Sequence, residues 1–333
     1  MNMRMLKVWA PDPSIVARIA VTDGMAEEAV SKLMDAGHEV DMSPDQLNGF
    51  DAVVIRSATK MTEGAIAAAP TLKLIGRAGV GVDNIDLEAA TDAGILVCNT
   101  PGSSTRSVVE LTIGHLLASA RHITTADRSL RAGEWAKKSL KGTELSGKRL
   151  GFIGFGRIAQ GVGEIARALG MELHAFDPYL PSEVAHEQGC VLHEDVNDVF
   201  RLCTHIAIHC NLTDETRHLV NAETLALMPG IGADGIACGN HLVSCARGGI
   251  VNEEDALEAL ENGGLASCAL DVFETEPVGD NPILQHPNFH GTPHIGAATS
   301  EAQARIGFEM AELIIGFFNG DTPKSVVNRA VLD

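Results

Sequence analysis

Residues 148–179 read KRLGFIGFGRIAQGVGEIARALGMELHAFDPY, and their pattern decides the fold of this part of the chain. The apolar run LGFIG predicts a buried strand, and a turn at Gly154 and Gly156 leads into a stretch with apolar residues on one face of a helix. Gly170 closes that helix, and the apolar run behind it predicts a second strand that ends on Asp177. A strand, a helix and a second strand in this order predict a βαβ unit with parallel strands.

The same residues predict a dinucleotide site. Gly154 permits the sharp turn, and Gly156 lets the backbone approach a pyrophosphate at the helix N-terminus. Ala159 supplies the small residue where helix and strand pack closely, and Asp177 lies where a carboxylate binds ribose hydroxyls and repels a 2′-phosphate, which favours NAD over NADP. The alternative is a purely structural glycine turn. The strand, helix, second strand and terminal acid occur in register, and this favours the dinucleotide.

The rest of the chain also alternates between strand and helix patterns. Apolar runs predict strands within 17–23, 50–57, 71–86 and 94–99, and helical patterns cover 27–37, 104–123 and 299–320. A chain of 333 residues is too long for a single small hydrophobic core, so we expect an α/β protein of two domains with buried parallel sheets. The last helical stretch follows the completed second series and could return to the first domain.

Composition excludes several function classes. The chain has 44 acidic and 25 basic residues, and the net charge of −19 would repel nucleic acid and anionic membranes. No apolar run is long enough to cross a membrane, and the N-terminus shows no secretory signal. Seven cysteines without a CxxC pair predict reduced, mostly buried thiols and a cytoplasmic location. The acidic charge suits a soluble cytosolic protein, and a salt-rich habitat is the alternative.

Four side chains that could bind a substrate or transfer a proton follow strand patterns of the second domain. HLVSC leads to Arg247, CALDVF leads to the acids Glu274 and Glu276, and His294 stands between a proline and a glycine in TPHIGAATSEAQ. Arg247 suits the carboxylate of a 2-oxo acid because its planar fork matches that group. A glutamate beside His294 would orient the imidazole and favour its protonated form, so that it could act as an acid. The alternatives are a surface arginine and a solvated acidic turn.

A metal site is a further possibility, because His286, His290 and His294 recur every four residues. Pro287 and Pro293 prevent a continuous helix there, so the three rings share no helical face. We therefore expect no metal.

These motifs resemble the D-isomer-specific 2-hydroxyacid dehydrogenases, most closely their D-3-phosphoglycerate dehydrogenase branch. The resemblance covers about residues 18–329 and rests on GRAGVGVDNIDLEAAT, NTPG, GTELSGKRLGFIGFGRI, CARGGIVNE, ALDVFETEP and TPHIGAATSEAQ. It implies two Rossmann-like or flavodoxin-like doubly wound domains with the active-site cleft between them. The substrate-binding domain would be residues 1–103 plus 296–333. The NAD-binding domain would be 104–295, including a dimerisation arm at 123–148 in a homodimer.

The resemblance also implies functional residues. Arg247 would orient the substrate, Glu276 would partner the histidine, and His294 would be the acid/base. NAD contacts would come from Gly154, Gly156, Arg157, Ile158, Asp177, His209, Cys245, Ala246, Arg247, Asp271, His294, Gly296 and Ala297. Substrate contacts would come from Arg56, Ser57, Arg77, Ala78, Gly79, Val80, Lys137 and Arg247, with Lys137 reaching a neighbouring subunit.

Three features depart from the family pattern. Asn211 stands where a proline is usual, Ser104 stands where an asparagine is common, and a glycine-rich insertion at 229–240 is expected at the N-terminal edge of the sheet. We expect no C-terminal regulatory module of the kind that some phosphoglycerate dehydrogenases carry, and therefore no feedback by serine through such a module. The expected reaction is oxidation of D-3-phosphoglycerate in serine biosynthesis. Sulfolactate oxidation and reduction of hydroxypyruvate or glyoxylate are alternatives, and an NAD(H)-sensing corepressor-like protein is an alternative of another class.

Overall fold

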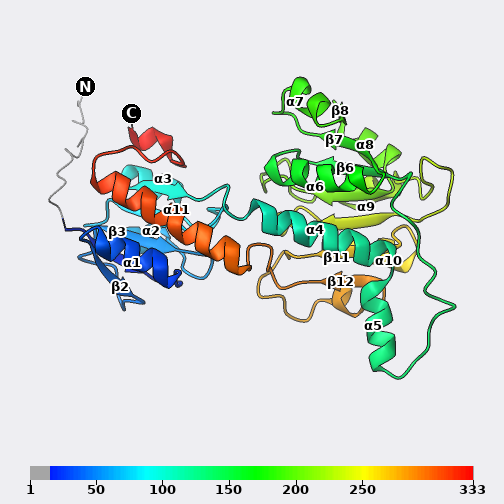
Figure 1. Cartoon of the computed structure of the whole chain (residues 1–333), viewed down its shortest axis with the longest axis horizontal. Coiled ribbons are helices and arrows are strands. Elements are labelled where there is room, and N and C mark those ends of the chain that lie inside the picture. Colours follow the sequence, from blue (N-terminus) through cyan, green and yellow to red (C-terminus); the bar gives the residue numbers. More distant parts are fainter. Residues whose placement is uncertain (1–15, 333) are drawn as a thin grey trace. The chain divides into compact units, whose positions relative to one another are not determined.

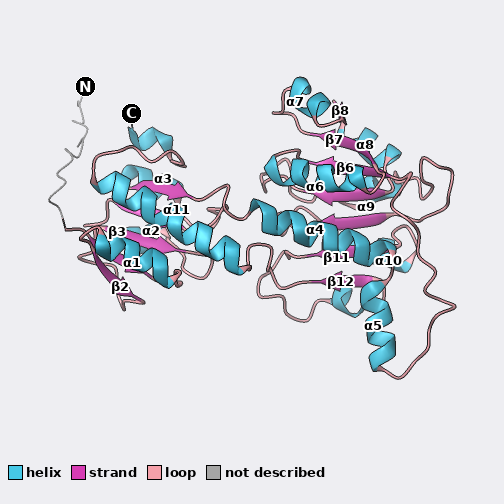
Figure 2. Ribbon diagram, in the orientation of Figure 1, coloured by secondary structure: helices cyan, strands magenta, loops and turns pink. Residues whose placement is uncertain are grey.

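The computed structural model describes residues 16–332, which form two compact units (Figure 1). One unit combines the chain up to Ser104 with the chain from Ala297 onward, and the other is Thr105–Gly296. Each unit is a parallel β-sheet covered by helices on both faces, so the predicted α/β class is confirmed (Figure 2).

The first unit has a five-stranded sheet in the order β2-β1-β3-β4-β5. Its elements are β1 (Arg18–Val21), α1 (Glu27–Asp35), β2 (Glu39–Met42), β3 (Ala52–Ile55), α2 (Glu63–Ala67), β4 (Leu74–Arg77), α3 (Leu87–Asp92), β5 (Leu96–Asn99), α11 (Ser300–Phe318) and η2 (Arg329–Leu332). Helices α1 and α11 lie side by side on one face, and α2 and α3 cover the other. Strand β3 is buried on both faces because its AVVI side chains alternate between these two cores.

The second unit has a seven-stranded sheet in the order β12-β11-β10-β9-β6-β7-β8. Its helices are α4 (Thr105–Ala120), α5 (Ile123–Arg131), α6 (Arg157–Ala168), α7 (Ser182–Glu187), α8 (Val196–Leu202), α9 (Ala222–Ala226), α10 (Glu253–Glu261) and η1 (Pro282–Gln285). Its strands are β6 (Arg149–Ile153), β7 (Glu172–Phe176), β8 (Cys190–His193), β9 (His205–Ile208), β10 (His241–Ser244), β11 (Ser267–Leu270) and β12 (Phe289–Gly291). Helices α4 and α6 pack on one face, and α8, α9 and α10 pack on the other.

Each sheet has a point where the strand order reverses. In the first unit it lies between β1 and β3, and in the second it lies between β6 and β9. Ligands of open α/β sheets bind at the carboxyl ends of the strands beside such a point. The segments that follow these four strands are therefore the first places to look for a site.

The glycine-rich insertion is anchored to the start of β6. The Asp234 carboxylate accepts a hydrogen bond of 2.5 Å from the ammonium group of Lys148, whose side chain is 2% exposed. The Asp234 amide also donates to the Gly147 carbonyl. These contacts fix the insertion where β6 begins, opposite the end of that strand that leads to Gly154.

The cysteines and the absence of a membrane-spanning pattern were both expectations from composition. All seven cysteines are free thiols, and six of them are buried. Burial raises the pKa of the Cys245 thiol to about 12, so this thiol is unreactive near neutral pH. Within residues 16–332, no helix has the length and hydropathy needed to pass through a membrane.

Candidate active site

The turn after β6 has the geometry that the sequence predicts. Gly154 has φ +84°, and a Cβ atom there would lie 2.8 Å from the backbone nitrogen of Cys210, so only glycine fits. Gly156 is the N-cap of α6 and has no side-chain cap, and nothing lies within 4 Å of where its Cβ would be. The first amides of α6 therefore face an open approach for an anion.

Asp177 is fixed at the end of β7 by the same turn. One of its carboxylate oxygens accepts a hydrogen bond from the Phe155 amide (2.9 Å), and the other accepts one from the Tyr179 amide (3.0 Å). Helix α6 lies close above β6 and β7 because Ala159 is small and fully buried and Gly163 has no side chain; a Cβ atom there would lie 3.0 Å from a methyl carbon of Leu173. An uncapped helix, an open glycine and a carboxylate one strand away fit the pyrophosphate and adenosine ribose of NAD.

His209 follows β9, the strand across the reversal point from β6. Neither of its ring nitrogens has a hydrogen-bond partner among residues 16–332, although both are buried. Burial lowers the pKa of His209 to about 4, so the ring is neutral. A buried polar ring without a partner at the reversal point is consistent with its predicted role at the cofactor.

His294 and Glu276 form the pair that the sequence analysis expected. The Nδ1 atom of His294 lies 2.7 Å from a carboxylate oxygen of Glu276, and the second oxygen accepts a hydrogen bond from the Phe273 amide (3.0 Å). Partial burial by itself raises the pKa of Glu276. The hydrogen bonds from His294 and Phe273 and the positive charge of Arg247 outweigh this effect, so the pKa lies below its usual range. Glu276 is thus held as a carboxylate that orients the imidazole through Nδ1.

The backbone of the His294 loop is held by Asp271, which is 1% exposed at the end of β11. Its carboxylate accepts hydrogen bonds from the Thr292 hydroxyl (2.6 Å), the Ile295 amide (2.8 Å) and the Gly296 amide (2.9 Å). His294 has φ +53°, a left-handed conformation that is unfavourable for a residue with a side chain. These bonds keep the loop in that conformation. The predicted contact of Asp271 with NAD stays a prediction.

Arg247 follows β10 in a turn that packs against the Glu276 loop. A Cβ atom on Gly248 would lie 1.7 Å from the Phe273 carbonyl oxygen, so the two loops meet only because residue 248 is glycine. Arg247 is half-buried and donates a hydrogen bond of 2.7 Å to the Ala246 carbonyl. The structure thus brings Arg247, Glu276 and His294 together at the carboxyl ends of neighbouring strands.

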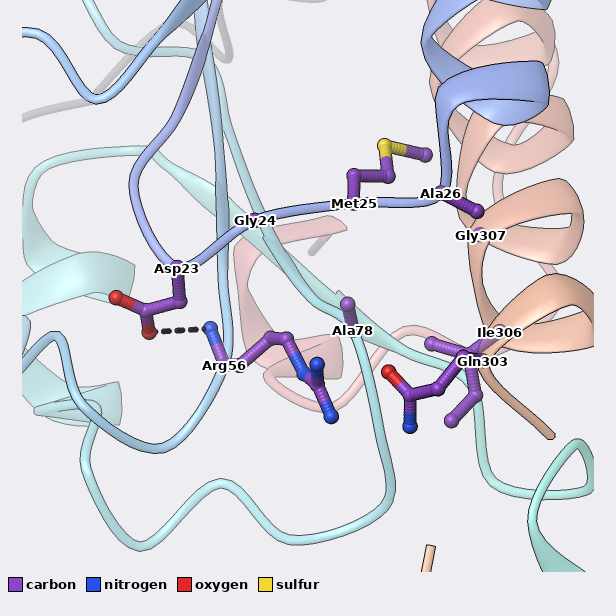
Figure 3. Close-up of a pocket in the computed structure, with 9 residues that line it drawn as sticks. All are labelled: Asp23, Gly24, Met25, Ala26, Arg56, Ala78, Gln303, Ile306 and Gly307. Carbon is purple, nitrogen blue, oxygen red and sulfur yellow. Dashed lines mark hydrogen bonds between the residues drawn. The ribbon is translucent and has the colours of Figure 1, made fainter. Parts of the chain in front are cut away.

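A separate cavity of ≈ 290 Å³ lies at the reversal point of the first unit (Figure 3). Its polar lining residues include Asp23 after β1, Arg56 after β3 and Gln303 of α11. The guanidinium of Arg56 and the amide of Gln303 point toward one another across it. Ala78 also lines the cavity, so two of the predicted substrate residues share it.

The other predicted substrate residues lie elsewhere. Ser57 is exposed in the loop behind Arg56. Arg77 folds over Gly79, where a Cβ atom would lie 1.6 Å from its guanidinium, and the Val80 carbonyl accepts a hydrogen bond from Asn99. Lys137 is exposed in the segment after α5. Their substrate contacts stay predictions.

Sequence reasoning missed Asp23, Asn84 and Gln303. Asp23 and Asn84 bind the loop that carries Arg56, and Gln303 donates from α11 to the Ala297 carbonyl (2.6 Å). One signal was available for Asp23, which directly follows the first strand pattern as the catalytic candidates follow theirs. Asn84 and Gln303 lie within the quoted motifs GRAGVGVDNIDLEAAT and TPHIGAATSEAQ, but no local pattern there indicated the roles that the structure gives them.

Known proteins resemble this chain over most of its length. The family described as D-isomer specific 2-hydroxyacid dehydrogenase, NAD binding domain, matches residues 113–296. D-3-phosphoglycerate dehydrogenase of Methanocaldococcus jannaschii is 45% identical over 94% of this chain and 60% of its own length. Hydroxypyruvate reductase of Thermotoga maritima is 42% identical over 89% of this chain and 97% of its own. The chain spans only about three fifths of the length of the phosphoglycerate dehydrogenases it matches.

A solved structure agrees with the fold and with the cofactor. D-lactate dehydrogenase from Aquifex aeolicus, complexed with NAD and lactic acid, is 26% identical with a TM-score of 0.82. The match covers 93% of this chain and 99% of that one. With the glycine turn, Asp177 and the paired His294 in place, the chain belongs to the D-isomer specific 2-hydroxyacid dehydrogenases, and residues 113–296 are its NAD-binding domain.

Proposed function

We propose that this protein is an NAD-dependent oxidoreductase that interconverts a small anionic 2-hydroxy acid and its 2-oxo acid, with D-3-phosphoglycerate as the favoured substrate. The observation that carries the proposal is the 2.7 Å contact between His294 Nδ1 and Glu276 beside Arg247. An oriented imidazole and a guanidinium are the two groups that oxidation of a 2-hydroxy acid needs besides a hydride acceptor.

Each residue then has one role. Nε2 of His294 accepts the proton of the substrate C2 hydroxyl in oxidation and returns it in reduction. Glu276 fixes the ring through Nδ1 and stabilises the imidazolium that forms. Arg247 binds the substrate carboxylate. When bound at the α6 turn and Asp177, NAD supplies the acceptor for the C2 hydride.

The first test is NADH formation from NAD⁺ with D-3-phosphoglycerate, compared with sulfolactate of each configuration. We expect turnover of phosphoglycerate, because the guanidinium of Arg56 extends into the cavity of the first unit (Figure 3) and can meet a distal dianion. Preference for sulfolactate would keep the catalytic roles and replace the substrate. Turnover of phosphoglycerate would also support a place in serine biosynthesis.

A second candidate is reduction of hydroxypyruvate or glyoxylate. It is favoured by the hydroxypyruvate reductase of Thermotoga maritima, whose length this chain matches almost completely. NADH oxidation with hydroxypyruvate gives one kcat/KM value, and NADH formation with D-3-phosphoglycerate gives the other. The ratio of the two values decides which acid is the preferred substrate.

The variant His294→Ala separates an enzyme from an NAD-sensing protein. We expect kcat to fall by ~10³-fold while NADH binding persists, because the ring moves a proton and the α6 turn is untouched. NADH binding by the wild type without turnover of any of these acids would support the sensor and contradict the enzyme.

We further propose a cytoplasmic homodimer. Helix α5 has no buried residue, and Ile123 (53%), Leu130 (57%) and Trp135 (82%) are largely exposed in and after it. Apolar side chains concentrated on one segment favour an interface. Light scattering after size-exclusion chromatography measures the mass, and a monomer would contradict the proposal.

A further inference from the structure

The loop that carries Arg56 is held by two side chains from other parts of the first unit. Asp23 accepts hydrogen bonds from the amides of Arg56 (2.7 Å) and Thr59 (2.9 Å). Asn84 donates to the carbonyls of the same two residues, at 2.7 Å and 2.6 Å. All four backbone polar groups of Arg56 and Thr59 are therefore bound by two side chains.

The carboxylate of Asp23 is bound to the backbone of the loop and to Thr59, and not to the Arg56 side chain. One oxygen binds both amides, and the other accepts a hydrogen bond from the Thr59 hydroxyl (2.6 Å). Among residues 16–332, the Arg56 guanidinium has neither a hydrogen bond nor an ion pair. Figure 3 shows this side chain leaving Asp23 and extending into the cavity toward Gln303. Asp23 thus lies next to Arg56 but binds the backbone amide of Arg56, so the positive charge of the guanidinium remains available to a ligand.

The ionisation of Asp23 agrees with this arrangement. Partial burial by itself raises the pKa of its carboxyl, but the hydrogen bonds from Thr59, Arg56 and Thr22 outweigh burial, and the pKa lies below its usual range. Asp23 is thus a full acceptor at every pH where an enzyme of this kind works.

We propose that Asp23, with Asn84, is a positioning residue that holds the Arg56 loop so that the unpaired guanidinium projects into the cavity and receives the distal anionic group of the substrate. This inference rests on the proposed function, because it takes the substrate to be a 2-hydroxy acid with a second anionic group. A substrate that binds to an already positioned cation does not have to order a mobile loop. Loss of Asp23 should therefore weaken the binding of the substrate and not slow the chemical step.

The test compares Asp23→Ala with the matched control Asp51→Ala. Asp51 also accepts a backbone amide, that of Arg18 (2.9 Å), but at the opposite end of β1 and β3, and it also pairs with Lys73. Calorimetry measures the Kd of D-3-phosphoglycerate, and steady-state kinetics measure KM and kcat with NAD⁺. We expect Asp23→Ala to raise Kd and KM by ~10-fold or more with kcat nearly unchanged, and Asp51→Ala to change neither.

Two further variants distinguish positioning from a general loss of structure. Asp23→Asn keeps one oxygen for the two amides and can donate to the Thr59 hydroxyl, so it should restore most of the affinity. In an Arg56→Ala background, Asp23→Ala should cause little further loss of substrate affinity, because Asp23 acts by positioning the guanidinium that this background lacks.

Several outcomes overturn the inference. The inference is wrong if Asp23→Ala leaves Kd and KM unchanged. It is also wrong if the losses of affinity in Asp23→Ala and Arg56→Ala are fully additive, or if Asp51→Ala weakens binding as much as Asp23→Ala does. If the wild type binds phosphoglycerate and Asp23→Ala weakens that binding, but no acid is turned over, the inference stands and the proposed function falls. A wild type that does not bind phosphoglycerate overturns the inference, whereas turnover of another 2-hydroxy acid would preserve the reaction type.

Discussion

At the residue scale, Gly154 and Gly156 serve one turn in different ways. A side chain at position 154 would be strained at φ +84° and would meet the Cys210 backbone, whereas position 156 has open space. We therefore expect Gly154→Ala to lower both Tm and NADH affinity. Gly156→Ala should leave Tm nearly unchanged and weaken NADH by ~10-fold or more, because its methyl group occupies the approach of the pyrophosphate. Thermal unfolding and NADH fluorescence titration check this pair, and equal effects of the two variants would contradict it.

Glu276 gives a prediction about pH. Its folded-state pKa is lowered, chiefly by the hydrogen bond from His294 against the opposing effect of burial. Its contribution to stability is therefore complete above the unfolded-state pKa of about 4.3 and is lost as pH falls through the lower folded-state pKa. Glu276→Gln should lower kcat by roughly 10²-fold at pH 7, because a neutral amide stabilises the imidazolium poorly. Denaturant unfolding should show a stability deficit near pH 7 that shrinks below pH 4. A deficit that grows in acid would refute this account.

Single residues also mark how far the sequence could predict the site. Arg247, Glu276 and His294 were predictable as candidates because each follows a strand pattern. Their spacing did not give the 2.7 Å contact, because the Phe273 amide holds Glu276 and the Asp271 carboxylate holds the His294 loop. Asp23 and Asn84 reach Arg56 from 33 and 28 residues away, so only the order of β1, β3 and β4 in the sheet brings them there.

At the scale of elements, burial decides what a sequence pattern reveals. The central strands β3, β9, β10 and β11 were predictable because their residues are buried on both faces. The helical pattern at 104–123 predicted one helix, but α4 ends at Ala120 and a second helix begins at Ile123. His122 between them adopts φ +52° and turns the chain. No residue of helix α5 is fully buried, and it contacts the rest of the second unit mainly through hydrogen bonds to the Pro287 carbonyl, so its sequence gave little signal of a packed face.

The glycine-rich insertion gives an element-scale prediction. Its Asp234 is the ion-pair partner of Lys148, and this lysine is buried. Removing the carboxylate leaves a buried ammonium without its counter-charge, so Asp234→Ala should lower Tm by ~3 °C or more. Adding Lys148→Met should recover part of that loss, because an apolar side chain of similar length needs no partner. Calorimetry measures both variants. NADH affinity is the control and should not change, because the pair lies at the opposite end of β6 from Gly154.

At the scale of the whole molecule, the alternation of strands and helices predicted both sheets, since each βα unit directs the next strand parallel to the last. The hydrogen bonds within each site needed the three-dimensional structure. Charge, in contrast, is known from composition alone. It acts on the whole molecule through self-repulsion that destabilises the compact state.

The net charge of −19 therefore gives a prediction about salt. The Debye length falls from about 10 Å at 0.1 M to about 3 Å at 1 M ionic strength, so added salt screens the repulsion among surface carboxylates. We expect Tm to rise by ~3–6 °C between 0.05 and 1 M NaCl at pH 7. Choline chloride at equal ionic strength should give a similar rise if screening is the cause, whereas sulfate would add its own effect on apolar burial. Differential scanning calorimetry in both chloride salts measures this. A Tm that falls with NaCl would show that the exposed ion pairs, which salt weakens, stabilise the fold more than the excess of acidic charge destabilises it.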